Sequence, residues 1–341
     1  MENLKKITPP EGVNIDHRPR VCLGMPLYNQ VKYLPEALNS LLAQTYRDFR
    51  LVIADDSTEP EAGRIVQSFA ARDHRIIYYK NESRLGMIDN WKNCFRLAGK
   101  VDYFAWVGDH DIWHPDWLDS MVRVLEAEPN VVLVYPLTIP IDREGQRRKK
   151  KSRSPFSTLG LDDPERVRAV SKHGRGFGKM VYGLFRAPAL HRAGVFRRVL
   201  FPDVILLWEL SLQGDIHQVD AELWYNRRTD AFSIARQKKS LFVKKPWYIA
   251  LPWPLVNACV LAWNTAVRSG SEVRSQTCLG YKLAITYLVR YIGRFGKGSW
   301  IGSVHEWRTG KKPFIRKIRR RLRSNNVTID TSRKSGPRAG S

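Results

Sequence analysis

Cysteine is scarce, and no two cysteines stand at the spacing of a metal or redox site. The 341 residues include four cysteines, none of them in a C-x-x-C pair. Cys22 and Cys94 lie in apolar segments. We therefore expect both to be small core residues of a protein in a reducing compartment.

Long apolar runs are also absent. No stretch of 18 or more purely apolar residues occurs, so the sequence predicts no membrane-spanning helix. The nearest candidate, Trp247–Val267, is broken by Pro252, Pro254, Asn257 and Asn264. The first residues, MENLKKITPPEG, lack the apolar centre of a secretory signal, so we expect a cytoplasmic protein.

Glycine-rich phosphate-binding loops are missing as well. Neither G-x-G-x-x-G nor the P-loop pattern occurs, and the first predicted strand–helix loop, MPLYNQ, contains no glycine. Its backbone therefore cannot approach a pyrophosphate as dinucleotide-binding folds do. A metal ion and basic side chains would have to neutralise a diphosphate, and Arg84 is one candidate. Nucleotidyl transfer to a sugar phosphate is disfavoured, because it expects such a loop.

Acidic residues are outnumbered, with 33 Asp and Glu against 57 Lys and Arg, for a net charge of +24. Most of this excess lies in residues 236–341, which hold 23 Lys and Arg but three Asp and Glu. Such a surplus indicates an anionic partner: nucleic acid, acidic lipid or a phosphorylated substrate.

The first 135 residues alternate short apolar runs with helical patterns. Buried strands are predicted at Val21–Met25, Phe49–Ala54, Arg75–Tyr79, Val101–Val107 and Val131–Tyr135. Apolar residues at helical spacing predict intervening helices around Leu34–Leu42, Ile65–Phe69, Met87–Leu97 and Trp117–Leu125. This alternation predicts an α/β fold with a mostly parallel sheet that helices flank on both faces.

The stretch Tyr103–Leu118, YFAWVGDHDIWHPDWL, carries the clearest chemical signal. Its apolar run stops at a glycine, Asp109 and Asp111 follow one residue apart, and Pro115 opens a predicted helix. Two carboxylates on such a turn can share Mg²⁺ or Mn²⁺, which prefer oxygen ligands and substrate phosphates. The alternative is a solvated turn in which an Asp caps the helix.

Polar residues follow each of the first four predicted strands. Because parallel strands end at one edge of a sheet, these side chains are expected to gather there, where ligands of open α/β sheets bind. The residues are Asn29, Asp55, Asp56, Asn81, Asp109 and Asp111. This convergence favours a binding site over a set of scattered surface carboxylates.

Several short motifs, in order, resemble family 2 glycosyltransferases with the GT-A fold across about Val21 to Arg228. The first are P-L-Y-N at residues 26–29, I-A-D-D-S-T at 53–58, N-x-x-x-x-G-x-x-x-N at 81–90 and D-H-D-I-W-H-P at 109–115. Then follow Y-G-L-F-R at 182–186, D-V-I-L-L-W-E-L-S-L-Q-G at 203–214 and N-R-R at 226–228. Each is weak alone, but their order and spacing make the resemblance specific.

The resemblance implies an inverting transfer of a sugar from a nucleotide sugar, with a divalent metal, Mn²⁺ or Mg²⁺, held by Asp109 and Asp111 on the diphosphate. Asp203 would be the general base. The residues predicted to bind the nucleotide sugar are Pro26, Tyr28, Asn29, Asp55, Asp56, Arg84, Asn90, Asp109 and Arg228. His110 departs from the family pattern, which usually has adjacent acidic residues here. Whether His110 ligates the metal stays open.

Two carboxylates compete for the role of base on the residues alone. Asp203 precedes an apolar helix predicted at Val204–Leu212 and could instead be a plain N-cap. Glu209 lies within that helix and could instead be buried and paired to Arg227 or Arg228. Those arginines could equally bind phosphate in a bidentate manner. A glycine-rich stretch at residues 173–178 is a candidate acceptor-side loop.

The predicted organisation is a flexible leader at 1–19, a GT-A domain at 20–235, a basic helical extension at 236–323 and a disordered tail at 324–341. The extension joins an aromatic block, a helical block at Leu279–Phe295 and a polybasic segment at residues 316–323. Basic residues interleaved with Trp, Tyr and Leu favour an interface helix on an anionic membrane. The alternative is a solvated helical cap. Nucleic acid is an unlikely partner, because no nucleic-acid motif accompanies the charge.

The sequence therefore predicts a metal-dependent glycosyltransferase on the cytoplasmic face of a membrane, acting on a saccharide or lipid-linked acceptor. The competing hypothesis is a catalytically silent GT-A-like scaffold that binds nucleotide or membrane. Release of nucleoside diphosphate distinguishes the two.

Overall fold

A computed structural model describes residues 4–6, 18–148, 155–173, 177–227, 240–268 and 274–295. The chain divides into two compact units, Met1–Tyr287 and Leu288–Ser341, and the fold below is that of the first. Most of the predicted leader, the polybasic segment at 316–323 and the predicted tail lie outside the described residues.

One mixed sheet forms the centre of the first unit, and the described residues contribute nine strands in the order β1-β4-β3-β2-β5-β8-β7-β9-β6. The strands are β1 Leu4–Lys6, β2 Val21–Leu27, β3 Phe49–Asp55, β4 Ile76–Asn81, β5 Tyr103–Trp106, β6 Ile112–Trp113, β7 Val131–Ile141, β8 Leu184–Arg186 and β9 Asp215–Arg227. The helices are α1 Leu34–Leu42, α2 Glu61–Ala70, α3 Met87–Ala98, α4 Trp117–Ala127, α5 Asp163–Lys172, α6 Ala187–Ala193, α7 Pro202–Leu210, α9 Trp253–Arg268 and α10 Arg274–Phe295, with 3-10 turns η1 Phe177–Tyr182 and η2 Trp247–Ala250.

The predicted α/β fold is confirmed, and all five predicted strands are present. β2, β3, β4 and β5 run parallel to one another, as expected for strands joined by helices. The predicted helices are also present, although α4 begins at Trp117, and Pro115 lies in the turn between the two-residue strand β6 and this helix. The sheet is less regular than predicted, since the antiparallel strand β8 separates β5 from β7.

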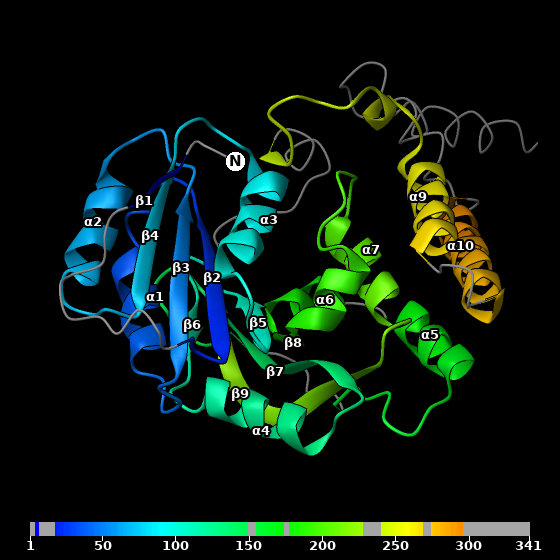
Figure 1. Cartoon of the computed structure of the whole chain (residues 1–341), viewed down its shortest axis with the longest axis horizontal. Coiled ribbons are helices and arrows are strands. Elements are labelled where there is room, and N and C mark those ends of the chain that lie inside the picture. Colours follow the sequence, from blue (N-terminus) through cyan, green and yellow to red (C-terminus); the bar gives the residue numbers. More distant parts are fainter. Residues whose placement is uncertain are drawn as a thin grey trace, which may run out of the picture. The chain divides into compact units, whose positions relative to one another are not determined.

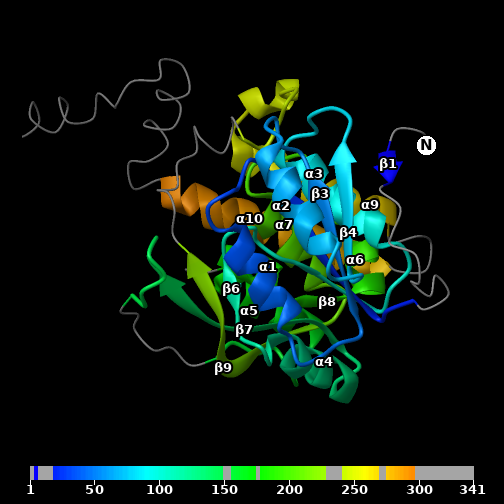
Figure 2. The ribbon, with the colours of Figure 1, turned by 90° about the vertical axis from the view of Figure 1, so that its left-hand side faces the viewer.

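Alternate residues of β2 face two different layers. Val21, Leu23 and Met25 join the core formed with α1, α2 and α4. On the other face, the missing side chain of Gly24 leaves room for two neighbours. These are the ring of Phe104 in β5 and the side chain of Cys94 in α3. Figures 1 and 2 show these layers, with α1 and α2 on one side of the sheet and α3 on the other. Cys22 and Cys94 are buried and free, as predicted.

The first part of the extension packs against α7. The buried amide of Asn257 in α9 donates to the backbone oxygen of Leu200 and to the hydroxyl of Tyr287 in α10. The ring of Tyr287 meets that of Trp208, with centroids 5.1 Å apart. Within the part of the chain that the structure describes, no helix has the length and hydrophobicity to cross a bilayer.

Candidate functional site

The loops that follow β2 and β3 are tied together by Asn29. Its backbone N–H donates to Ser57, its side-chain amide donates to Thr58, and its side-chain oxygen accepts from the N–H of Thr58. Asn29 has a φ of 50°, a left-handed conformation that Asn tolerates better than most residues. The predicted site residue Asn29 therefore shapes this edge of the sheet with its own polar atoms.

Asp55 and Asp56 end β3, but both are almost fully buried. Asp55 accepts a hydrogen bond from the Tyr78 hydroxyl at 2.6 Å, and its Oδ2 lies 3.3 Å from Nζ of Lys80. Asp56 accepts from the backbone N–H groups of Leu85 and Gly86, at 2.7 Å and 2.9 Å. This second carboxylate therefore fixes the loop that carries Arg84.

A buried cluster of amides supports the same loop. Asn81 donates to Asp56 and to Asn90, Asn90 donates to the backbone oxygen of Ala54, and Asn93 donates to Asn81. These side chains satisfy one another out of water, which is the condition for burying them at low cost. Asn90, a predicted ligand residue, thus belongs to the support of the site.

Tyr28 and Arg84 are the exposed members of this edge. The Tyr28 side chain is 45% exposed, and the guanidinium of Arg84 lies 4.7 Å from the centre of its ring. An exposed aromatic face beside a cation suits a planar base that carries phosphate. Pro26 lies at the end of β2 and is partly buried. Arg228, also a predicted ligand, lies outside the described residues.

The two aspartates of the D-H-D turn occupy different surroundings. Asp111 is 1% exposed and accepts hydrogen bonds from three groups of β9: the indole N–H of Trp224, the amide of Asn226 and the backbone N–H of Arg227. Burial raises the pKa of Asp111, although these donors oppose the shift. Asp109 is partly exposed and lies 2.6 Å from Nδ1 of His110. Burial alone would lower the pKa of His110, but Asp109 and Asp111 raise it to about 9.

This arrangement fits a divalent ion through Asp109 better than through the pair. Among the described residues, no group of three or more His, Cys, Asp or Glu side chains is arranged to hold a metal. Mg²⁺ often takes only one or two carboxylates and completes its shell with phosphate oxygens and water. Asp109 offers such a carboxylate, whereas a shared cation would require Asp111 to leave its three donors.

Arg227 joins the turn to the loop before α1. Its Nε donates to the backbone oxygen of His110, its Nη2 lies 2.5 Å from the carboxylate of Glu36, and its guanidinium lies over the ring of Tyr33. Arg227 is 3% exposed. Its role in the structure is therefore to hold the turn and β9 against the first half of the sheet.

Tyr182, the last residue of η1, lies near the acidic turn and is partly buried. Its ring packs on that of Trp224, with centroids 4.8 Å apart, and Trp224 in turn donates to Asp111. Burial raises the pKa of Tyr182, and the charges of Asp111, Asp109 and Asp203 raise it further. Because Gly178 of the same η1 lies against Asp203, η1 connects the acidic turn with the start of α7.

Asp203 is not the N-cap of α7. That position belongs to Phe201, which has a φ of 56°, and Asp203 is the second residue of the helix. Burial raises the pKa of Asp203, while the backbone N–H groups of Asp203 and Val204 act in the opposite direction. A Cβ at Gly178 of η1 would collide with Oδ2 of Asp203, so glycine at that position leaves room for the carboxyl.

Glu209, the competing candidate for the base, is buried and committed to other contacts. Its carboxylate lies 3.0 Å from Nη2 of Arg197 and accepts from the amide of Asn264 in α9. The predicted partners Arg227 and Arg228 are thus replaced by Arg197, since Arg227 pairs with Glu36 and Arg228 is not described. A carboxylate held in this way is suited to joining α7 with its neighbours.

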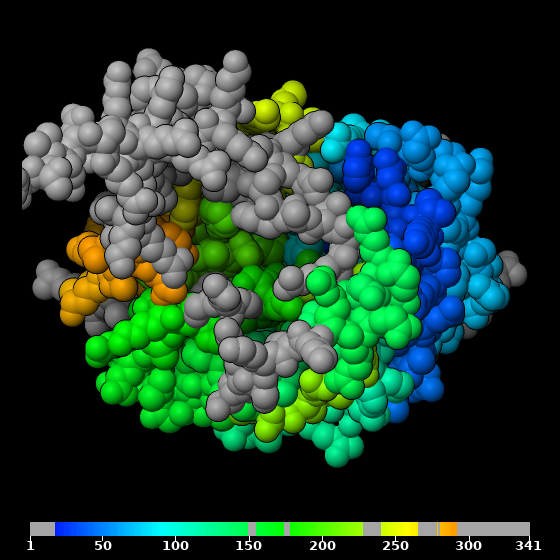
Figure 3. Space-filling model, turned by 180° about the vertical axis from the view of Figure 1, so that it is seen from behind, coloured from blue at the N-terminus to red at the C-terminus, as the bar shows by residue number. Residues whose placement is uncertain are grey.

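Sequence reasoning missed Tyr182, Trp224 and Lys179. The ammonium of Lys179 lies 5.6 Å from the ring centre of Trp224, which places a cation beside the acidic turn. Tyr182 begins the Y-G-L-F-R motif, so its position was signalled although no role was assigned to it. Figure 3 shows a hollow on this side of the molecule, bordered by green segments of the middle of the chain, with blue N-terminal segments to one side.

Comparison with known proteins shows which family the first part of the chain matches. The model of the family described as glycosyl transferase family 2 matches residues 22–184, which include Asp55, Asp56, Asp109 and Asp111. Residues 22–184 are a family 2 glycosyltransferase domain.

Relatives agree with this family domain. An uncharacterized glycosyltransferase of Rickettsia prowazekii is 29% identical over 120 residues, which are 35% of this chain and 36% of that protein. One of Methanocaldococcus jannaschii is 31% identical over 135 residues, which are 39% of this chain and 46% of that protein. The chain spans less than half the length of these relatives.

A solved structure supports the GT-A fold beyond the family match. The crystal structure of S. aureus TarS in complex with UDP-GlcNAc has a TM-score of 0.55 and 15% identity, covering 80% of this chain and 73% of that chain. The likeness in fold therefore covers more of the chain than residues 22–184.

Proposed function

We propose that the chain is an inverting glycosyltransferase that moves a sugar from a nucleotide sugar to an acceptor hydroxyl, with Asp203 as the general base. The observation that carries the proposal is the contact of η1 with both parts of the site. Gly178 of η1 lies against the carboxyl of Asp203, and the ring of Tyr182 packs on Trp224, which donates to Asp111. The acidic turn itself lies in the family 2 domain. The transfer needs a group that accepts the acceptor's proton and groups that stabilise the departing diphosphate.

Each residue is given one task in this mechanism. Tyr28 and Arg84 bind the base and the phosphates at the edge of β2 and β3, on the loops that Asn29 and Asp56 hold. Asp109 would hold Mn²⁺ or Mg²⁺, which supplies Lewis-acid stabilisation of the diphosphate charge. Asp111 positions the turn. Asp203 accepts the proton from the acceptor hydroxyl as this attacks the anomeric carbon, and its raised pKa makes it a stronger base.

A thermal-shift screen tests the donor part of the proposal. We expect one nucleoside diphosphate among UDP, GDP, CDP, ADP and TDP to raise the melting temperature, and Mn²⁺ or Mg²⁺ to enlarge that rise. The matching sugar nucleotide should then release free nucleoside diphosphate when an acceptor is present. Binding without any release from any sugar nucleotide would instead support the silent scaffold.

We further propose that the extension docks on an anionic membrane surface, where the acceptor is a saccharide or a lipid-linked saccharide. Trp247 is 79% exposed and Trp263 is 71% exposed, which is unusual for tryptophan on a soluble surface. Leu255, Cys259 and Trp263 stand four residues apart on the exposed side of α9. The described residues from 240 onward contain seven Lys and Arg and no Asp or Glu. Exposed Trp with basic neighbours suits the headgroup region of a bilayer.

Vesicle pelleting tests the membrane proposal. Lys244 and Lys245 are exposed beside Trp247, and each basic residue near an anionic surface contributes about 1 kcal/mol. Replacing both by Gln should weaken partitioning to phosphatidylserine vesicles by roughly 30-fold. The control is Arg123→Gln with Lys172→Gln, two exposed positions on α4 and α5 that remove the same charge. Equal loss in both pairs would mean that only net charge matters, and the docking surface would be rejected.

A further inference from the structure

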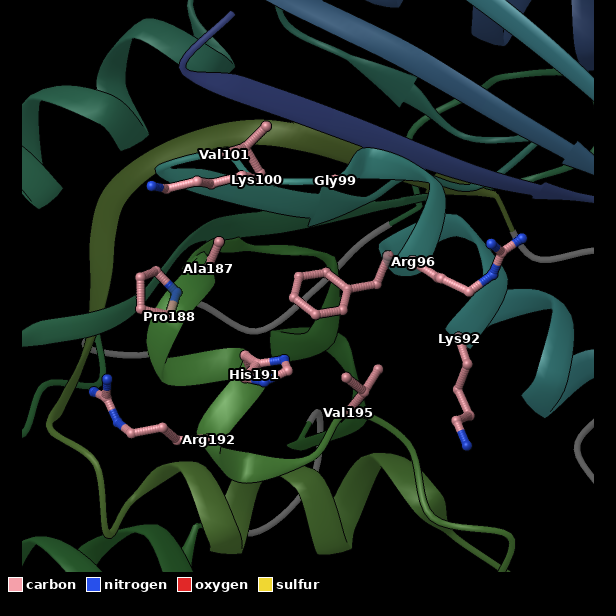
Figure 4. Close-up of a pocket in the computed structure, with 11 residues that line it drawn as sticks. Lys92, Arg96, Gly99, Lys100, Val101, Ala187, Pro188, His191, Arg192 and Val195 are labelled. Carbon is pink, nitrogen blue, oxygen red and sulfur yellow. The ribbon is translucent and has the colours of Figure 1, made fainter. Parts of the chain in front are cut away.

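A cavity of about 610 Å³ lies between the end of α3 and α6, and the proposed mechanism does not use it (Figure 4). Cationic side chains line it from both helices and from the turn between α3 and β5. These are Lys92, Arg96, Lys100 and Arg192. Among the described residues, no acidic side chain lines the cavity. Four positive charges around one hollow favour an anionic occupant.

Two of the four cationic side chains, Lys92 and Lys100, have no carboxylate partner within the part of the chain that the structure describes. Among the residues that the structure describes, neither Lys92 nor Lys100 forms an ion pair, and both are exposed. Arg96 donates to the side-chain oxygen of Asn93, which is uncharged. The basic residues in the last turns of α3 and α6 also complement the helix dipoles. The helix dipoles therefore explain the positions of Arg96 and Arg192. They explain neither Lys92 nor Lys100, and they do not explain why a cavity lies between the two helices.

The floor of the cavity is apolar. It is formed by Phe95 of α3, by Ala187 and Pro188 at the start of α6, and by Val101 and Val195. Figure 4 shows Lys92 and Arg96 of α3 on one side of the hollow and Pro188 of α6 on the other. A hydrated inorganic anion would gain nothing from such a floor, whereas an apolar group would be stabilised by removing this surface from water.

Val195 occupies the floor at a conformational cost. Its φ is 60°, a left-handed conformation that β-branched side chains rarely adopt, and it directly follows Gly194, whose φ is 85°. Such a backbone is strained and persists where the surrounding structure requires it, often beside ligands. Here the conformation places a valine, rather than the expected glycine, at the cavity.

We infer that this cavity binds an amphiphilic phosphate, that is, a phosphate or diphosphate monoester of an apolar chain. The rim cations would bind the phosphate, and the apolar floor would cover the first carbons of the chain. The site is separate from the proposed donor site. α3 begins beside the loop that Asp56 holds, whereas its middle and later residues, from Lys92 to Arg96, line the cavity. Tyr28, Arg84 and Asp109 are not among the lining residues.

Calorimetric titration of the full chain with octyl phosphate, inorganic phosphate and 1-octanol tests the inference. We expect octyl phosphate to bind at least tenfold more tightly than either of the others. Lys92→Gln with Lys100→Gln should weaken octyl phosphate binding at least tenfold, while the Arg123→Gln, Lys172→Gln pair should leave it unchanged. Circular dichroism confirms that each variant is folded. The inference is overturned if both pairs bind alike, or if octyl phosphate binds no more tightly than inorganic phosphate.

A second variant separates the floor from the rim. Val195→Gly relieves the left-handed strain and removes two methyl groups from the cavity, so it should fold at least as stably as the parent. Octyl phosphate should bind it more weakly, and inorganic phosphate should bind it as before. Unchanged octyl phosphate binding would show that the floor is not used. None of these titrations involves a sugar nucleotide, so their failure leaves the proposed transferase activity standing, and the reverse also holds.

Discussion

Asp203→Asn should lower the release of nucleoside diphosphate by about 10²- to 10⁴-fold while leaving nucleotide binding unchanged. The substitution keeps the shape of the side chain and removes its ability to accept a proton. The nucleotide-binding residues Tyr28 and Arg84 belong to other segments, the ends of β2 and β4, so their contacts are not altered. The measurement is initial-rate nucleotide release, alongside the thermal shift produced by the nucleoside diphosphate.

Two further variants make this prediction specific. Gly178→Ala should also slow release, because its new Cβ meets the carboxyl of Asp203 and must displace it. Glu209→Gln should weaken the ion pair with Arg197 and lower stability, with much less effect on the rate of the protein that remains folded. If Asp203→Asn retains full activity and Glu209→Gln abolishes it, the base has been assigned to the wrong carboxylate.

The same carboxyl gives a dependence on pH with a defined sign. Burial raises the pKa of Asp203, so the base becomes protonated at a higher pH than an ordinary Asp, and the acid limb of the rate profile should shift upward. A group with a raised folded pKa stabilises the fold only when protonated, and this contribution is lost as the pH rises through that pKa. Asp203→Asn should therefore melt higher than the parent at neutral pH, and the difference should vanish below about pH 4.

The strands and helices of the first half of the chain could be predicted because local pattern decides them. Val21–Leu27 and Phe49–Asp55 are buried apolar runs that end in polar residues, and helical spacing marks the segments between them. β8 and β9 could not be predicted in the same way. β8 has three residues, and β9 is a largely polar sequence, DIHQVDAELWYNR, whose buried residues do not follow an alternating pattern. Pairing with β7 determines both strands, and that pairing is not local.

The sequence predicts which residues belong to the site, but it does not predict how their side chains are oriented and paired. The strand-end pattern identified Asp55, Asp56, Asp109 and Asp111, yet the sequence does not reveal which of these carboxylates faces water. Asp111 is turned inward by Trp224, which follows it by 113 residues, and Asp56 is occupied by two N–H groups of the next loop. Burial and hydrogen bonding of this kind arise from tertiary contacts.

The second large effect is expected at Asp111, because Asp111 is buried under three donors whereas Asp109 is partly exposed. Asp111→Ala would leave the indole N–H of Trp224, the amide of Asn226 and the backbone N–H of Arg227 without their shared acceptor. Each buried donor left unpaired costs about 1–3 kcal/mol, so we expect the free energy of unfolding in urea to fall by about 3 kcal/mol or more. Part of the metal turn and of β9 would then lose its fixed position.

Asp109→Ala is the matched substitution, and we expect it to affect metal binding more than stability. Asp109 is partly exposed and pairs with one group, His110, so its removal should lower stability less than the removal of Asp111, which has three donors. It should, however, abolish the extra thermal shift that Mn²⁺ or Mg²⁺ adds to nucleotide binding, because the solvent-facing carboxylate is gone. If Asp109→Ala keeps that metal-dependent shift and Asp111→Ala loses it at unchanged stability in urea, the two roles are exchanged. The inward-facing carboxylate would then be the metal ligand, which requires it to exchange its three N–H donors for a cation when the nucleotide binds.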